Sequence, residues 1–391
     1  MLKLNERNST PIYTAIQCLY WITYGLIFNF ASIYLLDRQF TNSQIGLILG
    51  VSYALSACMQ PVIASIFSKR GVRLNRGAML VCSFVMLLAL ALLVFPMGKA
   101  VLTLCFVMIL TLQSSLQPTI NSLAHGLELS GIPVNFSLAR GAGSLAFSLM
   151  CMLMGAVLKK MAPAYLPCCY LATLLMLIFS LNCFSAPGRM ESTHSREKTR
   201  QASLLRRHPK FAVFLVGLVG LAFNHIFIDN FMIQIMNSLG GDSVHLGIAI
   251  FVAAVVELPA MLFYARLKRR IDPCLMLMLC SWFWFIKNAL IALASTPEAI
   301  YAAEALQFFS YAVYVPATID YITKTLPESD FLKAQAFAGS AFTLGSVFAA
   351  FIGGRLLDLM SVRNTLLVVL SFSAIGAVLF TAAIPVRRRR S

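Results

Sequence analysis

The chain has few charged side chains and is especially short of acids. Of its 391 residues only 12% are charged and only 15 are Asp or Glu, whereas 59% are hydrophobic and the mean hydropathy is +0.80. A soluble globular domain carries roughly 25% charged residues. The composition therefore excludes a soluble fold and makes the lipid bilayer the solvent for most of the chain.

The sequence also lacks the usual patterns of enzyme and metal sites. Five histidines are scattered, ten cysteines lie mostly inside apolar runs, and no Cys/His cluster has the spacing of a zinc site. No HExxH, Gly-x-Ser-x-Gly or ATP-binding P-loop sequence occurs. We therefore expect no enzyme activity, no cofactor and no metal.

Twelve apolar stretches are each long enough to cross a bilayer, which takes about 20 helical residues. Their continuous hydrophobicity differs from the alternating pattern of transmembrane β-strands. The sequence thus predicts an all-α polytopic membrane protein with 12 transmembrane helices in two six-helix bundles. The expected spans are 11–36, 43–67, 77–96, 99–126, 137–158, 164–185, 210–238, 244–267, 273–294, 297–324, 332–357 and 363–385.

One long hydrophilic segment divides the chain. We expect residues 1–185 to form an N-terminal six-helix bundle, residues 186–209 a cytoplasmic linker with a short amphipathic helix near SLLRRHPKF, and residues 210–391 a C-terminal six-helix bundle. Basic loops at 67–77 and 264–273 fall at matching positions of the two halves, which indicates an internal repeat.

The formal net charge of +16 has an uneven distribution. If both termini are cytoplasmic, 23 of the 31 Lys and Arg residues lie on the cytoplasmic side. This is the positive-inside bias of membrane proteins and argues against a nucleic-acid partner. We expect a multi-pass protein of a bacterial cytoplasmic (inner) membrane, functional as a monomer, whose first span is retained in the mature protein.

Polar residues within the first, fourth and fifth spans share helix faces. In the fourth span these are Gln113, Gln117, Asn121 and His125, which are spaced four residues apart. This spacing indicates a cavity wall or, alternatively, hydrogen bonding between helices.

The fifth and first spans also contain candidate cavity residues. In the fifth span Arg140 is followed at helical spacing by Ser144, Phe147 and Ser148, and in the first span Tyr24 lies deep enough to face a cavity. A cation within the bilayer is costly, so Arg140 either lines a solute pathway or extends to the membrane boundary. A guanidinium and an aromatic ring together suit a polar ring-shaped solute.

The second half contains acids and a lysine inside apolar runs. His225 and Asp229 are four residues apart in the seventh span, Glu257 interrupts the eighth, Lys287 lies in the ninth, and Glu304, Gln307, Tyr311 and Tyr314 lie close to one face of the tenth. A buried acid beside a buried cation is either a static pair or a proton site. We expect Glu257, then Asp229 and Glu304, to be the proton-coupling candidates together with Lys287. Asp320 and Lys324 are expected to form a boundary pair.

The sequence resembles the major facilitator superfamily, and within it the lactose permease-like oligosaccharide and nucleoside:proton symporters. The most specific similarity is LARGAGSLAF, which resembles the family's Arg-x-x-Gly element followed by an aromatic residue, here Arg140 and Phe147. The resemblance implies that these two residues contact the solute. It places Asn121 or Ser122 at the position of an acidic sugar ligand, so the carboxylate is missing.

The resemblance extends to the second half. Asp229 resembles the family's seventh-span aspartate, and Lys287 stands at its ninth-span arginine. Glu257 resembles the eighth-span glutamate, which implies a role in solute binding and coupling. The tenth span departs from the pattern, because the coupling histidine and glutamate fall on Gln307 and Ser310, which do not titrate, and its lysine falls on Glu304.

The sequence therefore predicts a secondary transporter for a sugar, glycoside or nucleoside, with proton coupling and rocking of the two bundles about a midplane site. Arg140, Asn121, Phe147, Gln117, Tyr24, Glu257 and Gln307 are the expected substrate-binding residues. Since no P-loop is present, uphill transport must use an ion or solute gradient. An efflux carrier of the same fold and a non-transporting solute receptor remain alternatives.

Overall fold

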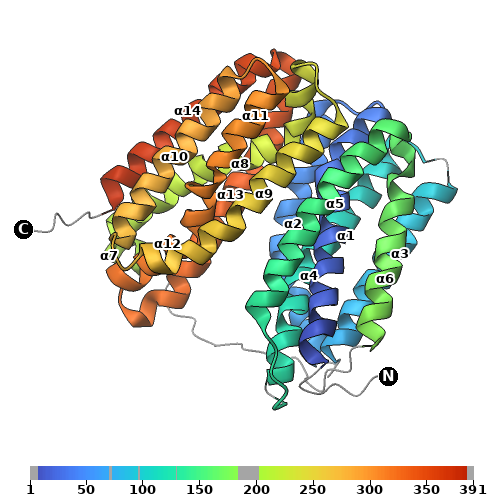
Figure 1. Cartoon of the computed structure of the whole chain (residues 1–391), viewed down its shortest axis with the longest axis horizontal. Coiled ribbons are helices and arrows are strands. Elements are labelled where there is room, and N and C mark those ends of the chain that lie inside the picture. Colours follow the sequence, from blue (N-terminus) through green and yellow to red (C-terminus); the bar gives the residue numbers. More distant parts are fainter. Residues whose placement is uncertain (1–7, 70–72, 96, 129, 184–201, 385–391) are drawn as a thin grey trace, which may run out of the picture. The chain divides into compact units, whose positions relative to one another are not determined.

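The computed structural model describes residues 8–69, 73–95, 97–128, 130–183 and 202–384, and these residues are helical almost throughout, with no strand among them (Figure 1). The chain separates into two compact units, Met1–Ser195 and Arg196–Ser391. Residues 186–201 of the expected linker, loop residues 70–72 and the basic tail Arg387 to Arg390 lie outside the described residues.

The first unit contains six long helices and one short 3₁₀ turn. Eleven helices of the described chain are long and apolar enough to cross a membrane, and six of them belong to this unit. Its elements are α1 (Ser9–Asp37), α2 (Asn42–Lys69), α3 (Leu74–Val94), α4 (Lys99–Glu128), α5 (Phe136–Lys160), η1 (Pro163–Tyr165) and α6 (Leu166–Cys183).

The second unit begins with a short helix and then repeats the pattern. The expected amphipathic helix at SLLRRHPKF is present as α7 (Ala202–Arg207) and is followed by α8 (Pro209–Ser238), α9 (Ser243–Leu267) and α10 (Pro273–Leu293). The remaining elements are α11 (Pro297–Glu304), η2 (Ala305–Phe308), α12 (Tyr311–Thr325), η3 (Glu328–Asp330), α13 (Phe331–Leu359) and α14 (Val362–Ala383).

The expected span over 297–324 is helical, but it is not one continuous helix. This stretch is divided into α11, η2 and α12, and Ser310 at the break has φ −104° and ψ −101°, outside the helical region. Hydropathy does not detect such a break, because residues on both sides of it are apolar. Broken helices within membranes occur where other protein groups satisfy the freed backbone.

The same pairing of helices occurs in both units. In the first, α1 packs on α5, α2 on α4 and α3 on α6. In the second, α8 packs on α13, α9 on the α11–η2–α12 segment and α10 on α14. Each unit thus pairs its first span with its fifth, its second with its fourth and its third with its sixth. This is the packing expected of two structurally related bundles.

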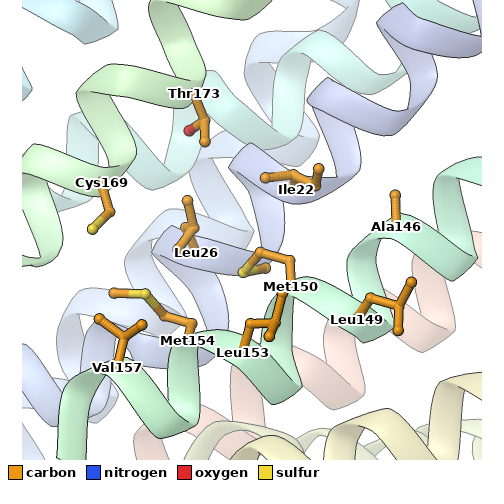
Figure 2. Close-up of a pocket in the computed structure, with 10 residues that line it drawn as sticks. All are labelled: Ile22, Leu26, Ala146, Leu149, Met150, Leu153, Met154, Val157, Cys169 and Thr173. Carbon is orange, nitrogen blue, oxygen red and sulfur yellow. The ribbon is translucent and has the colours of Figure 1, made fainter. Parts of the chain in front are cut away.

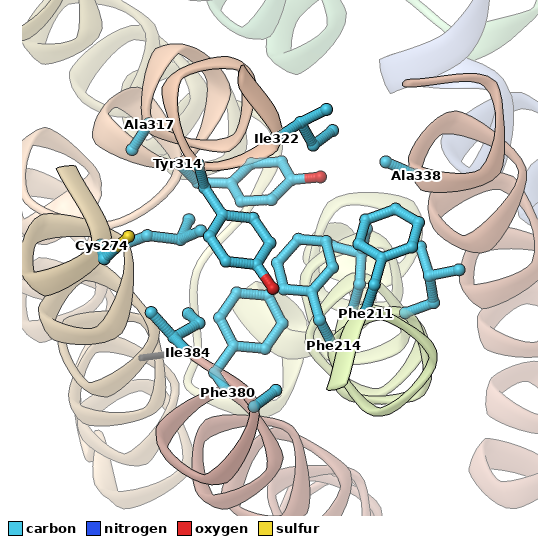
Figure 3. Close-up of a cluster of buried hydrophobic side chains, with 14 of the residues drawn as sticks. Phe211, Phe214, Cys274, Tyr314, Ala317, Ile322, Ala338, Phe380 and Ile384 are labelled. Carbon is cyan, nitrogen blue, oxygen red and sulfur yellow. The ribbon is translucent and has the colours of Figure 1, made fainter. Parts of the chain in front are cut away.

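Aromatic side chains fill the core of the second unit (Figure 3). Phe214 of α8 lies 4.9 Å from Tyr321 of α12 and 4.7 Å from Phe380 of α14, measured between ring centroids. Leu204 of α7 is also buried in this cluster, so the short helix is packed onto the unit. Fully buried aromatic rings contribute a large share of packing energy, and this core fixes the helices that carry the polar residues described below.

The charged residues near the ends of α9, α10 and α12 pair differently from the expected Asp320–Lys324 contact. Asp320 instead accepts a hydrogen bond from the Tyr264 hydroxyl at 2.7 Å and lies 3.3 Å from Lys268 Nζ. Lys324 pairs with Asp272, the N-cap of α10. The expectation was wrong because both side chains reach across to neighbouring helices rather than along their own.

Candidate functional site

Each unit contains one cluster of polar side chains centred on a cation. We call the first the arginine cluster, made of Gln17, Trp21, Asn121, Arg140 and Ser144. We call the second the lysine chain, made of Glu257, Lys287, Glu304 and Gln307.

Arg140 is held by an aromatic face and a hydroxyl group. Its guanidinium carbon lies 4.0 Å from the centre of the Trp21 ring, and its Nη1 donates a hydrogen bond to Ser144 Oγ at 2.5 Å. Arg140 is half-buried and lies one turn after the start of α5. A cation near a helix N-terminus is opposed by the helix dipole, whereas a cation–π contact contributes about 0.5 to 2 kcal/mol. Trp21 therefore helps to retain Arg140 within the bundle.

Hydrogen bonds connect Trp21 to the fourth helix. Trp21 Nε1 donates to Gln17 Oε1 at 3.2 Å, and Gln17 Nε2 donates to Asn121 Oδ1 at 3.1 Å and to the Tyr13 hydroxyl at 2.6 Å. Arg140 of α5, Trp21 of α1 and Asn121 of α4 are thus linked side chain to side chain. The structure connects two of the expected binding residues, Arg140 and Asn121, through Trp21 and Gln17. Sequence reasoning missed Trp21.

An aromatic row extends from the arginine cluster along α1. Trp21 contacts Phe147 edge-on at 6.3 Å and Tyr24 at 5.4 Å, and Tyr24 stacks on Phe28 at 4.3 Å. Phe28 in turn stacks on Tyr53 of α2 at 6.3 Å. All five rings are only partly buried. The row therefore offers ring faces and edges against which a flat apolar surface can pack.

Close approach of α1 and α5 depends on one of the two glycines after Arg140. A Cβ built on Gly143 would lie 2.8 Å from Trp21 Cδ1 and 3.3 Å from the Gln17 carbonyl oxygen. A Cβ on Gly141 would meet nothing within 4 Å among the described residues. Gly143 therefore permits the close approach of α1 and α5, and Gly141 does not contribute to it.

The polar stripe of the fourth span does not act as one surface. Gln113 is fully buried and accepts a hydrogen bond from the Tyr170 hydroxyl of α6 at 2.9 Å, so it joins two helices. His125 is exposed, whereas Gln117 and Asn121 are half-buried. Of the four, only Asn121 belongs to the arginine cluster.

The lysine chain joins three helical segments of the second unit. Lys287 Nζ of α10 donates to Glu304 Oε2 and to Gln307 Oε1, both at 2.7 Å, and Gln307 Nε2 donates to Glu257 Oε1 of α9 at 3.0 Å. The Lys287 and Glu304 side chains are 1% and 3% exposed, and Glu257 is half-buried. The expected residues Glu257, Lys287, Glu304 and Gln307 thus form one continuous chain of hydrogen bonds.

Two short elements of the tenth span carry Glu304 and Gln307. Glu304 ends α11 and Gln307 lies in η2, so the two side chains are presented by different local geometries. In a regular helix residues three apart lie on one face about one turn apart. Here both reach the same ammonium group of Lys287. One carboxylate oxygen of Glu304, Oε1, is buried without a hydrogen-bond partner among the described residues.

Asp229 lies apart from this chain. Its carboxylate is 3.6 Å from His225 Nε2, and its side chain is 46% exposed. His225 is buried, stacked on Tyr311 at 4.7 Å and edge-on to Trp284 at 5.2 Å. The i,i+4 pairing of His225 and Asp229 follows from helical spacing, but neither residue is hydrogen-bonded to Lys287 in the described contacts.

The electrostatics of the two clusters differ. The lysine chain contains two carboxyl groups and one ammonium group, so its formal charge is −1 when all three are ionised and zero when one carboxyl is protonated. Among the described residues no group of three His, Cys, Asp or Glu side chains is placed to hold a metal ion.

Comparison with known proteins gives a consistent assignment of the fold. The profile described as MFS_1 like family matches residues 13–368. The uncharacterized transporter YwbF of Bacillus subtilis (strain 168) is 23% identical over 94% of this chain and 93% of its own length. The maltose permease of Geobacillus stearothermophilus is 25% identical over 89% of this chain and 87% of its own length. The crystal structure of nucleoside transporter NupG superposes with a TM-score of 0.82 at 12% identity, covering 96% of this chain and 99% of that one.

Proposed function

The chain belongs to the MFS_1 like family of major facilitator transporters, and we propose that it carries a small hydroxylated ring solute across the membrane in symport with a proton. The solute is a sugar, glycoside or nucleoside, and the movement follows alternating access driven by the proton gradient. The membrane is the bacterial cytoplasmic membrane, with both termini on the cytoplasmic side, and the working unit is the monomer.

The lysine chain is the observation that carries proton coupling. Within this chain of hydrogen bonds, Lys287 donates directly to Glu304 and is linked to Glu257 through Gln307. Glu257 is half-buried, whereas Glu304 is almost completely enclosed. A proton can therefore bind Glu257 while Glu304 remains paired with Lys287. Protonation of Glu257 would be transmitted through the Gln307 amide to the break between α11 and α12.

The arginine cluster supports the solute class. Arg140, Ser144 and Asn121 supply donors and acceptors that match ring hydroxyl groups, and the aromatic row beside them supplies ring faces. Maltose permease and nucleoside transporter NupG are named for solutes that each contain a hydroxylated sugar ring. We assign solute binding to Arg140, Asn121, Phe147, Gln117 and Tyr24 in the first unit.

Uptake assays with a coupling mutant test this proposal. Right-side-out vesicles containing the protein are given labelled galactosides, glucosides and nucleosides, with and without a protonophore. The wild-type protein should accumulate one class saturably, and the protonophore should abolish accumulation. Glu257→Gln should lose accumulation driven by a pH gradient but retain exchange of labelled for unlabelled solute, because the neutral side chain still accepts the Gln307 hydrogen bond.

Glu328→Gln serves as the matched control, since this acid is exposed at the start of η3 and lies outside the lysine chain. It should transport like the wild type. Normal pH-driven accumulation by Glu257→Gln would remove Glu257 from the coupling mechanism. Absence of uptake of every solute by protein confirmed to be in the membrane would instead favour efflux or solute sensing.

A further inference from the structure

An apolar groove lies on the first unit between α1, α5 and α6 (Figure 2). Its volume is about 440 Å³. The walls are Ile22 and Leu26 of α1, Met150, Leu153 and Met154 of α5, and Cys169 of α6, with the side chains converging on a common space. The groove is separate from the arginine cluster, none of whose residues lines it.

The lining excludes a polar ligand. Thr173 carries the only hydroxyl group of the lining, and that hydroxyl already donates to the Tyr170 carbonyl oxygen at 2.9 Å. The three lining helices are all candidate membrane spans. Hydrocarbon is therefore the medium around the groove, and a void of this size lined by apolar groups gains contact energy when methylene groups fill it. The flexible side chains of Met150 and Met154 can adapt to an irregular occupant.

Positive charge marks one end of the groove. The lining follows α5 from Ala146 to Val157, which is about 16 Å at the helical rise per residue. Lys159 and Lys160 follow directly, both exposed, in the last turn of α5, where this candidate span ends. Lysines at the end of a span extend toward the headgroup region of the bilayer. An apolar slot and a cationic end are complementary to a lipid tail and an anionic headgroup.

We propose that this groove is a binding site for an anionic phospholipid, with one acyl chain between α1, α5 and α6 and the phosphate at Lys160. The lipid is a bound ligand of the first unit, distinct from the transported solute. Its binding does not depend on the proposed solute or on proton coupling.

Native mass spectrometry of the purified full-length protein tests the proposal. The protein is incubated with phosphatidylglycerol or phosphatidylcholine that carry identical acyl chains. Wild-type protein should retain phosphatidylglycerol about tenfold more strongly than phosphatidylcholine, which corresponds to about 1.4 kcal/mol. Lys160→Gln should remove this preference and Lys160→Arg should keep it, since both variants alter the side chain but only the first alters the charge.

A second experiment fills the groove with a larger side chain. Ala146→Phe places a ring in the groove and should reduce retention of phosphatidylglycerol by about tenfold. Leu175→Phe is the matched control, because Leu175 is 55% exposed on α6 outside the lining. Equal loss in both phenylalanine variants, or equal retention of the two lipids by the wild type, would overturn the proposal.

Two adjacent cysteines give a readout that needs no groove-filling variant. Cys169 lines the groove, whereas the exposed Cys168 does not. Phosphatidylglycerol should slow maleimide labelling of Cys169 several-fold in a Cys168→Ala protein and leave labelling of Cys168 unchanged in a Cys169→Ala protein. The same rate at Cys169 with and without the lipid would contradict binding in the groove.

Discussion

The arginine cluster and the lysine chain hold a cation in opposite ways. Arg140 is half-buried and contacts the face of Trp21 and the hydroxyl of Ser144, both of which are neutral. Lys287 is 1% exposed and bonded to a carboxylate and an amide. The first arrangement can exchange a protein contact for a solute hydroxyl at little cost. The second cannot change without moving a charge, because a lone buried ion is strongly disfavoured.

This difference suggests a division of labour between the two units. A guanidinium beside an aromatic ring and a hydroxyl group in a partly open site is suited to binding a neutral solute. A cation enclosed with acids is suited to coupling, since its partners must gain or lose a proton when the arrangement changes. The comparison would fail if variants in the two clusters had the same effects on binding and on stability.

The largest effect should come from Lys287→Met. Removal of the ammonium group leaves Glu304 enclosed without its partner, which costs about 3 to 5 kcal/mol when the acid stays ionised. We expect a clearly lower thermal unfolding midpoint in detergent and loss of pH-driven accumulation. Glu304→Met in the same background should recover much of the stability, because two apolar side chains replace a buried ion pair.

The double variant separates stability from coupling. It should fold but remain uncoupled, since the link from Gln307 to the ammonium group is absent. A double variant that accumulates solute normally would show that the Lys287–Glu304 pair serves the fold alone.

Arg140 should show the next largest effect, and on binding rather than on folding. Arg140→Lys retains the charge but loses the planar guanidinium that rests on Trp21 and bonds Ser144. We expect about a tenfold loss of solute affinity, corresponding to about 1.4 kcal/mol, with an unfolding midpoint close to that of the wild type. Equilibrium binding of the solute to purified protein measures this. A stability loss as large as that of Lys287→Met would break the contrast between the clusters.

The sequence revealed much of this arrangement because isolated charges are conspicuous in apolar helices. Arg140, Glu257 and Lys287 stand out against hydrophobic runs in which each charge is costly. The hydrophilic segment between the sixth and seventh spans predicts the two bundles. The internal pairing of helices in each unit is consistent with the repeat expected from the two basic loops. These features depend on composition and spacing, which are local in sequence.

Features that depend on tertiary contacts were missed. Lys287 of α10 and Glu257 of α9 bond to the side chains of Glu304 and Gln307 in the tenth span, and no local pattern encodes both partners. Trp21 was overlooked although it lies four residues after Gln17 and three before Tyr24 in the first span. Helical spacing alone could have identified it.

Substitutions at the two glycines after Arg140 should have a smaller effect on solute affinity than Arg140→Lys. Gly143→Ala forces a Cβ against Trp21 and the Gln17 backbone, so Trp21 must shift from beneath Arg140. We expect a several-fold loss of solute affinity. Gly141→Ala is the matched control, because open space surrounds it and alanine favours helix by about 0.5 to 1 kcal/mol. It should bind solute normally and unfold at the same or a higher temperature. Equal binding by both variants would show that the α1–α5 contact does not position Trp21.

The smallest effect on stability should come from breaking the exposed ion pair of Asp272 and Lys324. Partial burial tends to raise the pKa of Asp272, but hydrogen bonds from Lys324 and from the Cys274 backbone amide outweigh it, so the net effect lowers this pKa below its ordinary value. A lowered folded-state pKa contributes stability above the unfolded pKa of about 3.9, and this contribution is lost as the pH falls through the folded value.

The wild type should therefore exceed Lys324→Gln in stability at pH 7 by at most about 1 kcal/mol, since both side chains are substantially exposed. The difference should shrink as the pH falls below about 4. Unfolding midpoints of both proteins between pH 7 and pH 3 measure this, and a difference as large as that of the buried Lys287–Glu304 pair would show that exposure does not distinguish the ion pairs of this unit.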